Sequence, residues 1–147
     1  MSRARGRRAE RVARLPRKVA ELVAWERVCR VATAGEGGMP HLVPVCHVLA
    51  NGRIYFGSGN DGRKVRNIRE NPRVTVTVDV YSDHWGTLRG AMIQGCARVV
   101  EPGGEFRRLR RLLYRKYPQY PDQSALGDDD SVIVEVTPSH VFSWGLE

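Results

Sequence analysis

Apolar and polar residues alternate along much of the chain, which is the pattern of β-strands that bury one face. In RVTVTVDVY, residues 73–81, four valines point to one side while Thr75, Thr77 and Asp79 point to the other. Apolar, β-branched runs bounded by turn residues predict further strands at 27–35, 41–52, 53–57, 87–101 and 131–145, the last as one strand or two. We therefore expect six or seven short strands.

Apolar positions spaced three and four residues apart predict two amphipathic helices. Residues 8–25 carry one such stripe, on a helix that Pro16 either kinks or starts. Residues 103–118 carry the other, made of Phe106, Leu109, Leu113 and Tyr117. Because these helices lie before and after most of the strands and do not alternate with them, the pattern favours an antiparallel barrel over a parallel βαβ sheet.

Two features of the second predicted strand and its exit bear on the topology. Asn51-Gly52 follows the strand and is the strongest short signal for a hairpin, with residues 53–57 as the returning strand. Pro44 lies inside the strand and cannot donate to a ladder. This strand therefore has an edge, a bulge, or something other than a neighbouring strand against part of its backbone.

A short helix with cations at its start is predicted in GSGNDGRKVRNIRENP, residues 57–72. Asp61 is placed to cap a helix whose first turn holds Arg63 and Lys64, and Pro72 ends it. Free amides and the positive end of the helix dipole attract anions, and two cations there reinforce that attraction. The segment is either an anion site or an ordinary solvent-exposed helix start.

Length and charge limit the possible partners. With 147 residues the chain is expected to form one domain, in which a basic arm and helix at 1–25 precede a barrel at 26–147. The net charge is +8, of which residues 1–30 contribute +7, so the body is nearly neutral. Such an arm binds polyanions without regard to sequence or is simply solvated. Since no aromatic residues are interleaved with the charges, we expect no specific nucleic-acid partner.

The expected compartment is the cytoplasm. No run of 18 apolar residues predicts a membrane span, and the basic start is not followed by the apolar run of a secretory signal. Three cysteines without C-x-x-C spacing, in apolar segments, are typical of reduced thiols. No metal site is predicted.

The order of these motifs resembles the pyridoxamine 5′-phosphate oxidase-like split β-barrel proteins, which bind FMN or the deazaflavin coenzyme F-420. The resemblance covers roughly residues 20–145, and its most specific parts are G-x-P-H-x-V-P-V at 38–45 and K-x-x-N-I-x-x-N-P-x-V at 64–74. It implies a mainly β fold, a six-stranded antiparallel split β-barrel with flanking helices. It also implies a homodimer with its cofactor sites at the subunit interface.

The resemblance implies a set of cofactor-binding residues. Lys64 and Arg63 would bind the cofactor phosphate, with the hydroxyl of Ser58 as a donor. Backbone groups of the second strand would face the flavin ring edge, at Val43, Pro44, Val45, Cys46 and His47. Beside the ribityl chain would lie Tyr55, Phe56 and Gly57.

Two further residues have alternative interpretations. Gln94 is placed to reach the cofactor across a dimer interface. Trp144, like Trp85, either stacks on a cofactor or closes the neighbouring subunit's site, or else it is an ordinary core or interface residue.

The expected function is an FMN-dependent oxidoreductase in which hydride passes through the flavin to or from a small-molecule substrate. No arginine follows Arg115, so the C-terminal Arg-x-His type motif of pyridoxamine phosphate oxidases proper is missing and that reaction is not expected. The alternatives are a reductase using F-420 in the same groove, or a non-catalytic flavin or haem carrier. The sequence does not identify the substrate.

Overall fold

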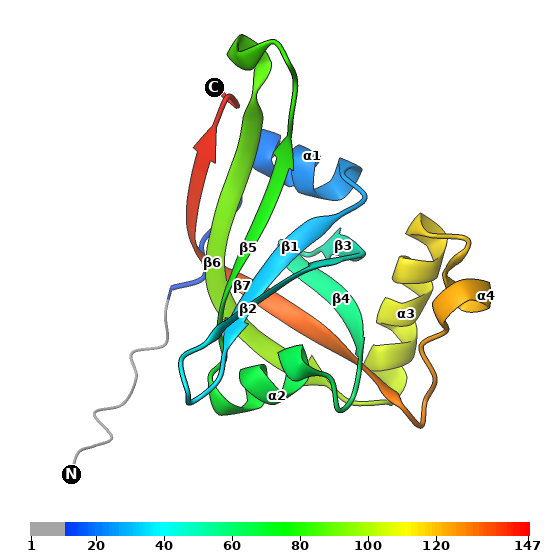
Figure 1. Ribbon diagram of the computed structural model, residues 1–147. Helices are drawn as coiled ribbons and strands as arrows, with labels where there is room; N and C mark the ends of the chain where they lie inside the picture. Colours follow the sequence, from blue (N-terminus) through cyan, green and yellow to red (C-terminus); the bar gives the residue numbers. More distant parts are fainter. Residues whose placement is uncertain (1–10) are drawn as a thin grey trace.

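The computed structural model describes residues 11–147, in which seven strands form one curled antiparallel sheet with helices around it (Figure 1). In chain order the elements are α1 Arg17–Trp25, β1 Cys29–Ala34, β2 Pro40–Val45, β3 His47–Ala50, β4 Arg53–Gly59, α2 Arg63–Glu70, β5 Arg73–Val80, the 3-10 turn η1 Trp85–Thr87, β6 Arg89–Val100, α3 Gly104–Lys116, α4 Tyr120–Ser124 and β7 Ser131–Trp144. The architecture is that of a split barrel, as expected.

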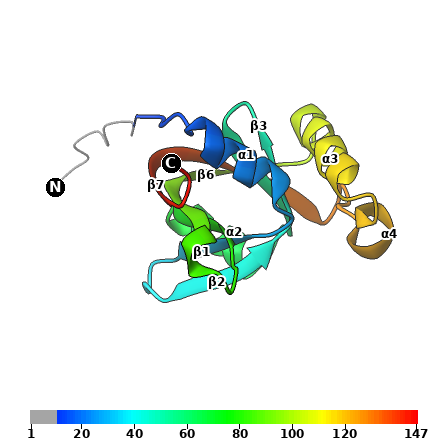
Figure 2. The same cartoon turned by 90° about the horizontal axis from the view of Figure 1, so that it is seen from above.

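The strand order β2-β1-β5-β6-β7-β4-β3 places two consecutive strands at opposite edges of the sheet. Only Cys46 separates β2 from β3, so the sheet must curl until its edges meet there, as the end-on view in Figure 2 shows. The single strand predicted at 41–52 is therefore two strands with different partners. The sheet has seven strands, within the six or seven that the pattern predicts and one more than the six-stranded barrel that the resemblance implies. Residues 42–50, LVPVCHVLA, are mostly apolar and contain no glycine, and for that reason the pattern did not reveal the change of partner.

Pro44 lies on β2, which pairs only with β1 and is an edge strand, one of the possibilities that the sequence left open. The hairpin prediction is confirmed. Asn51 and Gly52 join β3 to β4 with φ angles of 52° and 73°, the left-handed conformation that this turn requires.

The barrel interior is the larger of two apolar cores. It contains the inward valines of β5 and side chains from α1 and α2, which lie across opposite ends of the barrel (Figure 1). The smaller core lies under α3, where Phe106, Leu109 and Leu113 are fully buried against Tyr55 and Ile133. The predicted apolar face of this helix is confirmed, including Tyr117 just after its end.

The first helix begins later than predicted. Pro16 is its N-cap, and residues 11–16 precede it without helical structure, while residues 8–10 of the prediction lie outside the described part of the chain. A proline disfavours helical conformation in the residue before it. Of the two alternatives, Pro16 starts the helix.

The sixth strand, β6, is irregular at Gly95. The pairing of β6 with β7 shifts between Gln94 and Gly95, and a Cβ on Gly95 would lie 2.3 Å from the carbonyl oxygen of Thr137. The last segment is one strand, β7, not two.

Candidate functional site

A groove of about 310 Å³ lies where the two edges of the sheet meet, and it is the candidate cofactor site. Its lining residues come from β2 and its link to β3, from β4, from the start of α2 and from the segment around α4. They are Pro44, Val45, Cys46, Gly57, Lys64, Tyr117, Gln119, Tyr120, Gln123 and Ser124. Five of the predicted site residues, Pro44 to Cys46 with Gly57 and Lys64, thus line one groove.

Lys64 is the cation of this groove. It is partly buried, and within residues 11–147 it has no hydrogen bond to another side chain and no carboxylate partner. Burial lowers the pKa of its ammonium below the usual value because desolvation disfavours the charged form. An anionic ligand in the groove would supply the missing counter-charge.

The start of α2 adds backbone donors beside Lys64. The N-cap is Gly62 without any side-chain cap, so the prediction that Asp61 caps this helix is wrong. The first helical hydrogen bond runs from the N–H of Arg66 to the oxygen of Gly62, at 3.0 Å, and the N–H of Gly62 donates to the oxygen of Gly59. The amides of residues 63–65 have no partner within the helix and are available to a ligand. Ser58 is buried behind this turn, and its Oγ donates to the oxygen of Gly59 at 3.1 Å.

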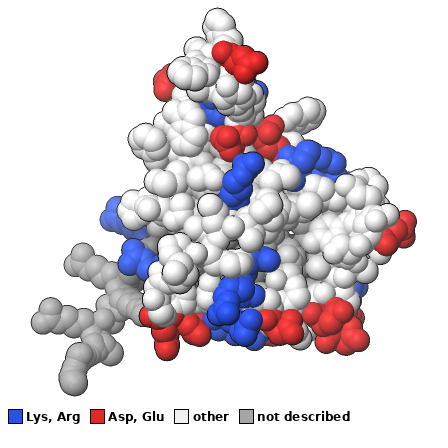
Figure 3. All heavy atoms as spheres, in the orientation of Figure 1, with Lys and Arg blue, Asp and Glu red and all other residues white. Residues whose placement is uncertain are grey.

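Arg63 does not line the groove with Lys64. Its side chain lines a second hollow, between α2 and the β1–β2 hairpin, which we call the hairpin hollow. Lys and Arg side chains gather over α2 on the face shown in Figure 3, with carboxylates on both sides. Neighbouring residues of a helix point about 100° apart, and here that angle sends the two cations into different hollows.

The wall of the groove is fixed by Tyr117. Its hydroxyl accepts the N–H of His47 at 2.9 Å and shares its proton between the carbonyl oxygens of His47 and Arg27, each 2.9 Å away. The cations of Arg27 and Lys116 lie 5.0 and 5.4 Å from the centre of its ring. Burial raises the pKa of this hydroxyl to about 12, so it stays protonated at neutral pH. Tyr117 thereby fixes the backbone at the junction where β2 ends and β3 begins.

The side chain of His47 points away from the groove into the protein. It is fully buried, and its Nε2 lies 2.7 Å from the carbonyl oxygen of Val23 on α1. Burial, together with the nearby Lys116 charge, lowers its pKa to about 4, so the imidazole is neutral. Only the backbone of His47 lies at the junction between β2 and β3.

Two other predicted residues lie in the cores, and a third lies on β2 outside the groove. Phe56 is fully buried inside the barrel, and Tyr55 is buried under α3, where its hydroxyl donates to Glu135 at 2.9 Å. Burial raises the pKa of Tyr55 to about 12. Val43 is partly buried on β2 and does not line the groove. A cofactor in the groove is therefore accessible to Gly57 of β4 but not to the side chains of the two preceding aromatic residues.

Sequence reasoning missed the aromatic and amide wall around α4. Tyr120 packs edge-on against Tyr117, with ring centroids 6.2 Å apart, and burial raises its pKa to about 12. A Cβ on Gly57 would lie 2.9 Å from the Tyr120 hydroxyl and 2.6 Å from a methyl group of Leu126, so these side chains occupy the space beside the glycine. The available signal was the cluster of tyrosines and amides in YPQYPDQS, residues 117–124, directly after a helix end.

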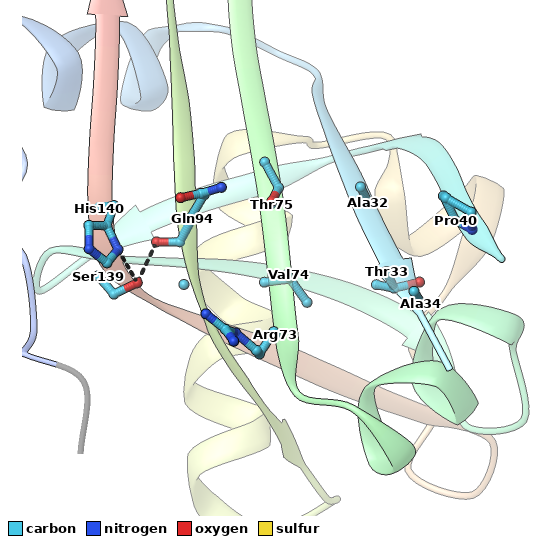
Figure 4. A pocket seen from close by; sticks show the side chains of 11 residues that line it. Ala32, Thr33, Ala34, Pro40, Arg73, Val74, Thr75, Gln94, Ser139 and His140 are labelled. Carbon is cyan, nitrogen blue, oxygen red and sulfur yellow. Dashed lines mark hydrogen bonds between the residues drawn. The ribbon is translucent and has the colours of Figure 1, made fainter. Parts of the chain in front are cut away.

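Gln94 and Trp144 lie elsewhere in this chain. Gln94 is exposed on β6 and lines a hollow of about 280 Å³ on the outer face of the sheet, beside Arg73, Thr75 and His140 (Figure 4). The hydroxyl of Ser139 donates to its carbonyl oxygen at 3.1 Å. Trp144, at the end of β7, packs over Gly90. The structure of one chain does not bring these two residues to the groove.

The described residues offer no disulfide and no metal site. Cys46 is exposed at the groove, Cys96 is exposed elsewhere, and burial raises the pKa of Cys29 to about 12; all three are free thiols. Residues 11–147 contain no cluster of potential metal ligands. The helices within that range are too short or too polar to cross a membrane.

One curated protein is similar over most of the chain. It is a 5a,11a-dehydrotetracycline/5a,11a-dehydrooxytetracycline reductase of Streptomyces rimosus, 30% identical over 123 residues, which are 80% of this chain and 74% of the reductase.

Solved structures share the fold. An FAD-binding protein of Mesorhizobium loti aligns with a TM-score of 0.73 at 21% identity, over 88% of this chain and 94% of its own. An F-420 reductase aligns with a TM-score of 0.69 at 23% identity, over 87% of this chain and 98% of its own. The sequence profile of pyridoxamine 5′-phosphate oxidase matches residues 15–145. This chain, with its curled sheet split at Cys46, therefore belongs to the pyridoxamine 5′-phosphate oxidase family.

Proposed function

We propose that this chain is an oxidoreductase that binds a phosphate-bearing flavin in the groove beside Lys64, with FMN as the first candidate. The observation that carries the proposal is a partly buried ammonium without a partner among the described residues, next to the uncapped start of α2. The reductase relative and the family membership support the same reaction class. F-420 in the same groove is the alternative, supported by the shared fold of the F-420 reductase.

When bound, the flavin supplies the hydride chemistry, and the protein supplies binding and electrostatics. Lys64 and the first amides of α2 hold the phosphate. The link at Cys46, held by Tyr117, presents its backbone to the ring, and Tyr120 with the amides around α4 limits the access of water. The substrate class proposed is a small organic molecule that accepts hydride.

We also propose a homodimer. Leu42 on β2 and Phe142 on β7 are 64% and 63% exposed on strands of the same sheet, and an exposed apolar face of this kind is typical of an interface. In such a dimer Gln94 of the partner subunit would approach the cofactor, since in its own chain it lies away from the groove.

The test is a titration of the apoprotein with FMN and with riboflavin, which lacks the phosphate. Lys64→Ala removes a charge-assisted contact worth about 1.5–3 kcal/mol, so FMN affinity should fall about ten- to a hundredfold while riboflavin affinity hardly changes. Arg66→Ala is the matched control, because Arg66 is an exposed cation of the same helix outside the groove. If the affinities for FMN and riboflavin fall equally, or if neither affinity falls, Lys64 does not hold a phosphate.

A further inference from the structure

The outer face of the sheet carries another hollow, drawn in Figure 4, which we call the sheet hollow. It has a volume of about 280 Å³ and shares no lining residue with the groove beside Lys64. Its walls come from β1, the start of β2, β5, β6 and β7. Apart from Gln94, none of its residues has a role in the function proposed above.

The register of the strands places three polar side chains of the sheet hollow side by side. Thr75 on β5 pairs with Gln94 on β6, and Gln94 pairs with His140 on β7. Directly paired residues of neighbouring strands point to the same face of a sheet, and so do residues two apart on one strand. Arg73, two residues before Thr75, therefore joins this group, and Figure 4 shows its side chain reaching from β5 towards β6.

The irregularity at Gly95 adds a further polar residue to the sheet hollow. Gln94 pairs with His140 and Gly95 with Pro138, so the pairing skips Ser139. Consecutive residues of a regular strand point to opposite faces, but Ser139 and His140 both line the hollow. An extra residue of this kind redirects side chains and is frequent next to active sites. Here it gathers two polar side chains on one face.

The hydrogen bonds around Ser139 leave one ring nitrogen of His140 for a ligand. The Ser139 hydroxyl donates to the carbonyl oxygen of Gln94 at 3.1 Å, and its Oγ lies 3.2 Å from Nδ1 of His140. Since the hydroxyl has a single proton, Nδ1 donates to Oγ. Nε2 has no partner within residues 11–147. An anion beside this nitrogen favours the imidazolium form, in which both ring nitrogens are donors.

The two sides of the sheet hollow differ in character. Towards β6 and β7 the wall carries the polar side chains just described, together with the guanidinium of Arg73. Towards β1 and β2 it is mainly apolar, with Ala32, Ala34 and Pro40. None of the described residues that line the hollow is acidic. An arginine fork binds carboxylate and phosphate groups through two parallel hydrogen bonds, so the polar side suits an oxyanion and the other side a compact hydrocarbon.

We propose that the sheet hollow binds a small organic anion, with a carboxylate or phosphate group at Arg73 and His140 and a compact apolar part against β1 and β2. The inference goes beyond the proposed function, because it concerns a second ligand site and requires neither the flavin nor the dimer. The hollow is a depression in the sheet face that the proposed dimer covers, so a partner subunit would close over the bound anion.

The experiment is a calorimetric titration of the full-length apoprotein with benzoate, with its neutral analogue benzamide and with inorganic phosphate. Benzoate should bind at one site per chain, at least about tenfold more tightly than benzamide, the effect of one charge-assisted contact. Arg73→Gln should lower the affinity for benzoate about ten- to a hundredfold, and His140→Gln should lower it by a smaller factor. Arg30→Gln is the matched control, because Arg30 is an exposed cation of the same sheet that is bonded to Asp79 and lies outside the hollow. All three side chains are exposed, so the variants should fold.

The two anions distinguish the possible ligands. Binding of phosphate alone would identify a phosphate-bearing ligand, binding of benzoate alone a carboxylate, and competition between the two would show that the site accepts both. The proposal is overturned if benzamide binds as tightly as benzoate, if Arg30→Gln lowers the affinity as much as Arg73→Gln, or if neither anion binds. Titration with FMN reports on the cofactor groove separately, so a protein that binds benzoate but no flavin would overturn the proposed function and leave this site standing.

Discussion

Several residues at the site hold the groove in shape through hydrogen bonds between the two edges of the sheet, which meet at Cys46. Tyr117 is the clearest case, because its hydroxyl joins α3 to backbone groups on either side of the gap in the sheet, at Arg27 and His47. The neighbouring Lys116 donates to the oxygen of Glu26 at 2.8 Å and strengthens the same junction. At this scale, fold stability and groove shape depend on the same contacts.

Tyr117→Phe should destabilise the protein by about 1–3 kcal/mol, because it leaves buried backbone groups without a partner while keeping the ring. The substitution should also lower the affinity for riboflavin, because the backbone at Cys46 loses the hydrogen bonds that hold it. Urea denaturation and a riboflavin titration measure the two effects. Tyr81→Phe is the control, because Tyr81 is 68% exposed, and similar losses in both variants would contradict the role of Tyr117.

The buried His47 predicts a pH dependence of stability. Its pKa is about 4 in the folded protein against 6.5 ordinarily, so the unfolded chain binds the proton more readily. The stabilisation is therefore complete above pH 6.5 and is lost as the pH falls towards about 4, with a total of about 3 kcal/mol. Unfolding free energies measured between pH 7 and pH 4.5 should show this slope, and His47→Gln should flatten it. An unchanged slope in the variant would assign the effect to other groups.

At the scale of elements, close approaches of backbone set the course of the strands. The longest pair, β6 with β7, passes the irregularity at Gly95, where there is no space for a side chain next to the backbone of Thr137. On β4, Gly57 leaves space for the side chains of Leu126 and Tyr120. These positions fix the curvature of the sheet and the wall of the groove.

Gly95→Ala should destabilise the protein by about 2 kcal/mol or more, because its Cβ meets backbone atoms that cannot turn aside. Gly104→Ala, on α3 with nothing within 4 Å of its Cβ position, should be neutral or slightly stabilising. Thermal unfolding of the two variants tests this directly. A Gly95→Ala protein as stable as the Gly104→Ala protein would mean that the irregularity is easily relieved.

At the scale of the whole molecule, one face of the curled sheet remains without a partner in a single chain. Its strands carry the exposed Leu42 and Phe142, and Gln94 lines a hollow on it (Figure 4). A second copy of the chain is the occupant that would bury these residues and bring Gln94 towards a cofactor.

Sedimentation should therefore report a dimer at micromolar concentration, and Phe142→Glu should shift it towards monomer by placing a charge in the interface. The same variant should lose cofactor affinity if the partner completes the site. Trp25→Glu is the control, since Trp25 is 79% exposed on α1 and not on the sheet. A wild-type monomer that holds its cofactor would rule out the shared site.

The sequence by itself determined what depends on local pattern. Alternation located β5, Asn51-Gly52 located a hairpin, Pro72 ended α2, and the apolar stripe of α3 named its buried face. These signals suffice because steric limits on a few adjacent residues control them.

The tertiary structure decided which of these residues meet. The change of strand partner at Cys46 falls within a mostly apolar run without glycine, residues 42–50, so no local turn signal marks it. Arg63 and Lys64 are adjacent in sequence but line different hollows, and Tyr120 reaches the groove from a segment more than fifty residues away. The resemblance implies a place for the backbone of His47 at the ring edge, and the structure shows that its side chain contacts α1. Which partner a strand takes, and which way a side chain turns at its end, depends on apolar burial summed over the whole barrel, and that sum exists only once the sheet has curled.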